Sequence, residues 1–78
     1  MARIIDGVEK NLVGKRIKEL RLQKGISQQA LSDRLETHAI YICRGSVSRI
    51  EDRKRTVTDI ELYGLSQVLG VPIEEFFK

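Results

Sequence analysis

Several features that would restrict the function of a chain are scarce in these 78 residues. Cys43 is the one cysteine, so no disulfide can form within the chain, which favours a reducing compartment. No apolar run approaches the roughly 20 residues that a membrane-spanning helix needs. Residues 1–10 lack the apolar core of a secretory signal. We therefore expect a cytoplasmic protein that does not contact a membrane.

Side chains that carry catalysis or bind metals are equally scarce. His38 is the only histidine, and with Cys43 it makes two potential ligands where a tetrahedral zinc site needs four. No nucleophile motif surrounds the serines, and there is no Gly-rich phosphate loop. The sequence thus predicts no enzyme, no metal and no cofactor. Cys43 is expected to be a small, half-buried residue at the start of a helix.

Basic residues are missing from one part of the chain and concentrated in another. Residues 56–77 contain four acidic residues and no lysine or arginine, whereas residues 44–55 contain five basic and two acidic ones. The formal net charge is only +3. This distribution predicts a positive end suited to a polyanion and a negative end left for another role, although scattered surface charge fits the same counts.

The remaining pattern is helical throughout, without a repeat or a linker. Apolar residues recur three and four positions apart, and we predict helices in five segments: about 11–24, 28–36, 44–52, 59–69 and 73–77. Residues 37–43 have neither a helical nor an alternating period, so they are expected to form an extended loop. No strand is predicted.

The ends of these helices have recognisable capping residues. Asn11 and Ser27 are suited to the N-cap position, with Asp6 and Glu9 offering a competing, earlier start for the first helix. Thr58 and Glu61 have the spacing of a capping box. Glycines at 25 and 70 stand where the first and fourth helices should end.

The third predicted helix has a polar outward side. Val47 and Ile50 turn inward, and serines and arginines occupy the other positions. The major groove of DNA admits a helix, and an arginine can bond guanine O6 and N7 in a bidentate manner. The basic run at 53–55, just past the helix, would reach phosphates, where charge matters more than base sequence.

Four segments, taken in order, resemble the lambda-repressor-like, Cro-like (Xre) family of helix-turn-helix DNA-binding domains. They are GKRIKELR at 14–21, GISQQALS at 25–32, VSRIE at 47–51 and the closing stretch at 65–77. The resemblance implies a compact all-α domain of five helices over residues 11–78, with an expanded loop between helices two and three. Residues 1–10 would be an N-terminal segment that could be flexible.

The resemblance also implies roles for individual residues. Together with the outward side of the third helix, it assigns base contacts to Arg44, Gly45, Ser48 and Arg49. It assigns phosphate contacts to Ser27, Gln28, Arg53, Lys54 and Arg55, and a semi-buried ion pair to Arg21 and Glu51. The implied function is sequence-specific binding of double-stranded DNA by a homodimeric transcription regulator, which we expect to be a repressor.

Two departures from the family pattern complicate these assignments. The turn between helices two and three is longer than usual, and the loop together with Tyr63 would suit a protein partner. An alternative function is therefore a protein-interaction module, such as the antitoxin of a toxin–antitoxin pair. Arg53 stands where the family commonly has glycine. A left-handed backbone there would cost roughly 1 kcal/mol, so we expect the chain to leave the helix differently.

Overall fold

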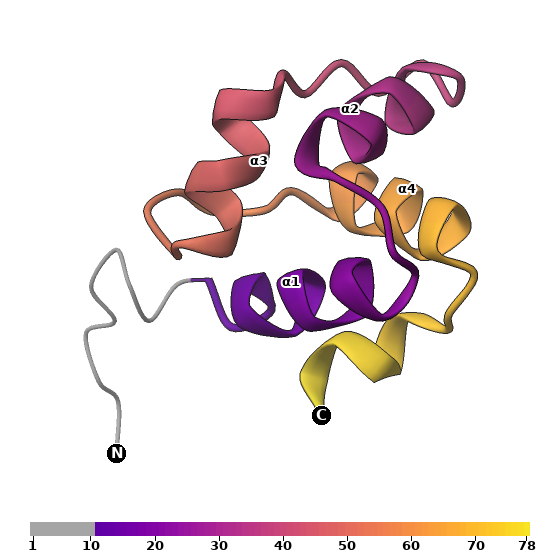
Figure 1. The fold of residues 1–78 in the computed structure, drawn as a ribbon. Coiled ribbons are helices and arrows are strands. Elements are labelled where there is room, and N and C mark those ends of the chain that lie inside the picture. Colours follow the sequence, from indigo (N-terminus) through magenta and orange to yellow (C-terminus); the bar gives the residue numbers. More distant parts are fainter. Residues whose placement is uncertain (1–10) are drawn as a thin grey trace.

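The computed structural model describes residues 11–78, and all regular structure in them is helical, which confirms the all-α prediction (Figure 1). Five elements follow one another: α1 (Gly14–Gln23), α2 (Gln28–Glu36), α3 (Arg44–Glu51), α4 (Asp59–Leu69) and η1 (Ile73–Phe77). The expectation for residues 1–10 lies outside the described residues. Within 11–78, no helix is long and apolar enough to cross a membrane.

The local signals place the starts of α2 and α4 where they were predicted. The Ser27 hydroxyl accepts the amide of Ala30, and the capping box of Thr58 and Glu61 is formed in both directions. The first helix differs, because α1 begins at Gly14 and Asn11 lies ahead of it, outside the helix. The last element is a 3-10 helix of five residues.

Four helices end through a residue in the left-handed conformation. Two of these residues are the expected glycines, Gly25 and Gly70, and two are not glycine: Ala39 (φ 61°) and Arg53 (φ 60°). The expectation that the chain would leave α3 differently at Arg53 is therefore wrong. The amide of Arg53 donates to the Ile50 carbonyl (3.0 Å) and that of Lys54 to the Arg49 carbonyl (2.8 Å), so this geometry satisfies the last carbonyls of the helix.

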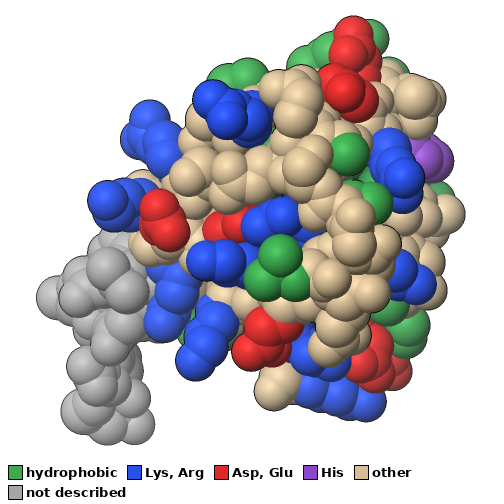
Figure 2. All heavy atoms as spheres, in the orientation of Figure 1, with side chains coloured by type: hydrophobic (Ala, Val, Ile, Leu, Met, Phe, Trp, Pro, Cys, Tyr) green, Lys and Arg blue, Asp and Glu red, His purple; other side chains and the backbone are tan. Residues whose placement is uncertain are grey.

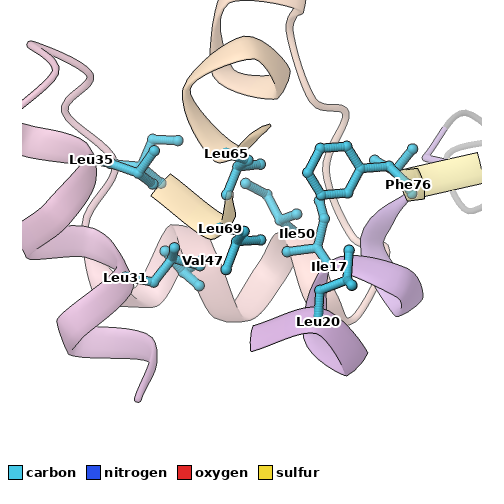
Figure 3. Close-up of a cluster of buried hydrophobic side chains, with 11 residues drawn as sticks. Ile17, Leu20, Leu31, Leu35, Val47, Ile50, Leu65, Leu69 and Phe76 are labelled. Atoms are coloured by element: carbon cyan, nitrogen blue, oxygen red, sulfur yellow. The ribbon is translucent and has the colours of Figure 1, made fainter. Parts of the chain in front are cut away.

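A single apolar core holds the helices together (Figure 3). All five elements contribute to it, and the labelled side chains include Ile17 from α1, Leu31 from α2, Leu65 from α4 and Phe76 from η1. Truncating such a leucine to alanine typically costs about 2–5 kcal/mol. Because α3 contributes through one side only and packs against α1 and α2 at the edge of the domain, its other side faces outward (Figure 1).

Candidate nucleic-acid interface

The outward side of α3 is open along its length. Val47 and Ile50 are each 2% exposed and face the core. The four residues predicted to contact bases lie on the opposite side, three of them exposed and one half-buried: Arg44, Gly45, Arg49 and Ser48. In Figure 2, Lys and Arg side chains gather on the side of the molecule that α3 occupies in Figure 1.

A side-chain hydrogen bond from α2 tethers the part of the loop that leads into the N-terminal end of α3. The Ser32 hydroxyl of α2 donates to the Ile42 carbonyl (2.5 Å), and the Ile42 side chain is 4% exposed. Ile42 thus takes the buried place next to the helix, and Cys43 faces solvent, so the expectation of a half-buried Cys43 is wrong. The Ser46 hydroxyl, 3.5 Å from the thiol, and backbone amides of the first turn lower the pKa of Cys43.

The C-terminal end of α3 is joined to α1 by a buried ion pair. Arg21 Nε lies 2.6 Å from Glu51 Oε2, and the two side chains are 8% and 1% exposed. A second guanidinium nitrogen donates to Glu51 Oε1 (3.1 Å) and a third to the Ile26 carbonyl (2.8 Å). The structure therefore brings together the two residues that the family resemblance paired. The pair crosses from the last turn of α1 to the last residue of α3.

The residues expected to bind phosphates differ in their surroundings. Gln28 Nε2 donates to Glu51 Oε1 (3.0 Å), so this side chain already has a partner inside the domain. Ser27 is exposed at the N-terminus of α2, where backbone amides and the helix dipole favour an anion. Its hydroxyl accepts the amide of Ala30 and remains a donor.

Two of the three cations in the turn after α3 also have partners within the domain. Arg53 Nε donates to the Asn11 carbonyl (2.8 Å), and the guanidinium of Arg55 contacts both carboxylate oxygens of Glu61 (3.0 and 2.9 Å). The hydrogen bonds from Arg55 lower the pKa of Glu61. Lys54 is exposed, and no described residue forms an ion pair with it.

The sequence analysis missed the role of the residues just before α1. The Asn11 side chain is 1% exposed and donates to the carbonyls of Ile50 and Arg55, both at 2.9 Å. A Cβ on Gly14 would overlap the Ile50 carbonyl oxygen, so only glycine permits this approach of α1 to α3. These contacts join residues about forty positions apart, and the only local signal was the glycine at the start of a helix.

A second exposed surface lies between α4 and the loop of residues 37–43 that joins α2 to α3. A groove of about 460 Å³ is lined by residues 38–41 of the loop and by Thr58, Ile60, Glu61 and Tyr63. Three of its apolar or aromatic side chains are more than half exposed: Tyr41 (77%), Ile60 (65%) and Tyr63 (56%). The loop therefore adds an apolar surface next to the start of α4.

Comparison with known proteins gives a family and a structural likeness to a solved protein. A family model described as helix-turn-helix matches residues 17–76. The crystal structure of the restriction-modification controller protein C.AhdI from Aeromonas hydrophila is similar to this chain, with a TM-score of 0.75 and 28% sequence identity. The match covers 87% of this chain and 91% of that one. No curated protein matches significantly.

Proposed function

Because this chain belongs to the helix-turn-helix family of non-enzymatic, DNA-binding transcription regulators, we propose that it recognises specific duplex sequences with α3 in the major groove. The observation that carries the proposal is the asymmetry of α3. Its apolar side chains are buried in the core, and the side that bears Arg44 and Arg49 is open. A groove about 12 Å wide accepts a helix presented in this way.

The contacts follow from the position of each group. Arg44 and Arg49 are the candidates for bidentate bonds to guanine, because a guanidinium matches the O6 and N7 acceptors. Gly45 and Ser48 lie between them and let the backbone approach the base edges. Ser27 at the start of α2 and Lys54 beyond α3 flank this side, and they would bind the phosphates on either side of the groove.

The proposed unit of binding is a homodimer. Two copies related by a twofold axis would place their α3 helices in successive major grooves, with half-sites about 34 Å apart. The proposed form of regulation is repression. It needs no further domain, because a protein bound at a promoter is enough to exclude other proteins from it.

Selection of bound fragments from random duplex DNA, followed by titration of the recovered site, tests the proposal. We expect an inverted repeat to be recovered. Arg49→Ala should reduce discrimination at one position of each half-site by about 1–3 kcal/mol, because one bidentate contact is lost. Lys54→Ala should weaken binding to all sequences alike, since a phosphate contact carries no base information.

Arg34→Ala is the matched control, since Arg34 is an exposed arginine of α2 outside the proposed interface. It should leave discrimination unchanged. If Arg49→Ala and Lys54→Ala changed discrimination equally, the division of roles would be wrong. If the wild-type protein bound no duplex at low salt, DNA recognition by α3 would be refuted and a protein-interaction module would be the better explanation.

A further inference from the structure

The side chain of Asn11 uses its full hydrogen-bonding capacity. Its carbonyl oxygen accepts the amides of Val13 (3.2 Å) and Gly14 (2.8 Å) at the start of α1. Its amide nitrogen donates to two carbonyls, one at the end of α3 and one in the turn that follows. One buried side chain therefore bonds to the amides at the start of α1 and at the same time ties α1 to the segment that leaves α3.

Arg53 completes this arrangement from the other side. Its side chain donates to the backbone carbonyl of Asn11, and its backbone amide donates to the same Ile50 carbonyl that Asn11 binds. Arg53 holds a left-handed conformation that ordinarily favours glycine. The side-chain contact that glycine could not make gives this arginine a structural reason to be there.

Resting on the proposed function, we propose that Asn11 and Arg53 form a latch that positions Lys54 as the single phosphate-binding cation of this turn. The latch fixes the backbone on both sides of Lys54, through the Ile50 carbonyl before it and the Arg55 carbonyl after it. Asn11 and Arg53 are positioning residues in this assignment, and Lys54 is the group that touches DNA.

The two neighbouring arginines each have a hydrogen-bond partner within the domain, Arg55 through both terminal nitrogens and Arg53 through Nε. The guanidinium of Arg55 donates hydrogen bonds to the Glu61 carboxylate and to the Thr56 carbonyl. The bonds to Glu61 tie the turn to the first turn of α4. Arg53 is turned back onto α1 by its bond to Asn11. This differs from the assignment that the family resemblance gave, in which all three cations bind phosphates.

The salt dependence of DNA affinity separates the two assignments. Each phosphate contact contributes about 0.9 to the slope of log affinity against log salt concentration. Lys54→Ala should therefore lower the slope by about 0.9. Arg53→Gly should fold, because glycine accepts the left-handed conformation. It removes the bond from the Arg53 side chain and keeps both bonds donated by Asn11, so the slope should fall by less than half of the change in Lys54→Ala. Arg34→Ala controls for the loss of one positive charge away from the site.

Asn11→Asp tests the positioning role. Aspartate keeps the oxygens that bond to the amides at the start of α1 and cannot donate to the carbonyls of Ile50 and Arg55, so the variant keeps the bonds to α1 and opens the latch. In the wild-type background Lys54→Ala should weaken binding about tenfold. In the Asn11→Asp background the same change should cost less than about twofold, whereas Arg49→Ala should cost the same factor in both backgrounds. Asn11→Ala repeats the comparison without the added charge.

Three results would overturn the latch. The first is a slope that falls by about 0.9 in Arg53→Gly and by about a further 0.9 when Lys54→Ala is added, which would make Arg53 a phosphate ligand independent of Lys54. The second is a full loss on Lys54→Ala in both Asn11 backgrounds. The third is a wild-type slope for Lys54→Ala. If the Asn11 variants do not fold, the slopes of Arg53→Gly and Lys54→Ala still decide. All of these results require wild-type binding, so a wild-type protein that binds no duplex refutes the proposed function instead.

Discussion

The two ends of α3 are held in different ways. At the N-terminal end, the side-chain bond from Ser32 to the Ile42 carbonyl tethers the loop, and Cys43, Arg44 and Tyr41 around it are exposed. At the C-terminal end, Glu51 is buried in an ion pair with α1, and the Ile50 carbonyl accepts bonds from two different segments. One end is fixed to the domain, and the other presents side chains to solvent.

This difference would separate the orientation of the helix from its proposed recognition of DNA. A buried ion pair contributes little net stability, because the loss of hydration of both charges offsets much of their attraction. It does, however, define where Glu51 must lie relative to α1. The C-terminal end can therefore fix the direction of α3, which leaves the exposed side chains along the helix, Arg44 and Arg49 among them, free for the proposed base contacts.

The largest test of the comparison is to break the fixed end. Glu51→Ala leaves Arg21 buried without its counter-charge, and we expect it to lower the free energy of unfolding by about 3–5 kcal/mol. Arg49→Ala, two positions away on the exposed side, should change it by less than about 0.5 kcal/mol. Urea denaturation followed by circular dichroism measures both. A cost below about 1 kcal/mol for Glu51→Ala would mean that this end is not held as described.

A smaller test compares the left-handed residues that precede and follow α3. Ala39 has no side chain to bond with, so Ala39→Gly should relieve its backbone and stabilise the domain by about 0.5–1 kcal/mol. Arg53→Gly gives the same relief and loses the bond to the Asn11 carbonyl, so its net effect should be close to zero. Thermal unfolding of the two variants measures this. An equal gain from both would show that the Arg53 side chain contributes nothing to the C-terminal end.

The smallest test is the pH dependence of the turn after α3. Bonds from Arg55 hold the pKa of Glu61 below its usual value, so its contribution is present above the unfolded pKa and is lost as the pH falls through the folded pKa. Glu61→Gln keeps an acceptor for the capping box and removes the charge. The wild type should be more stable than this variant at pH 7 by less than about 1 kcal/mol, with the difference shrinking below about pH 4.5. A difference that stays constant from pH 7 to 3 in urea titrations would contradict this.

Local signals in the sequence predicted the helices well where the cap is also local. Ser27 and the pair Thr58 and Glu61 act within one turn, and α2 and α4 begin next to them as expected. Asn11 was predicted as a cap in the same way, but its side chain also bonds to the end of α3, and α1 starts later. A pattern within one segment cannot reveal a partner about forty residues away.

The candidate site shows the same division. The exposed side of α3 could be predicted, because it follows from the helical spacing of Val47 and Ile50. The ion pair of Arg21 and Glu51 came from the family resemblance and not from spacing. The partners of Gln28, Arg53 and Arg55 were missed, because a charged or amide side chain looks equally free in a sequence whether it faces solvent or a neighbouring helix.

If α3 enters the major groove as proposed, its length limits how many base pairs one copy of the protein can recognise. Eight residues extend about 12 Å, which corresponds to roughly three or four base pairs. A given four-base-pair sequence recurs by chance about once in every 256 base pairs, so one copy of the protein would meet a very large number of matching sites in a genome. Two copies of the protein on an inverted repeat would recognise eight base pairs, a sequence that recurs about once in 65,000 base pairs. Because this helix is short, association of two copies is what would allow the protein to select one site in a genome.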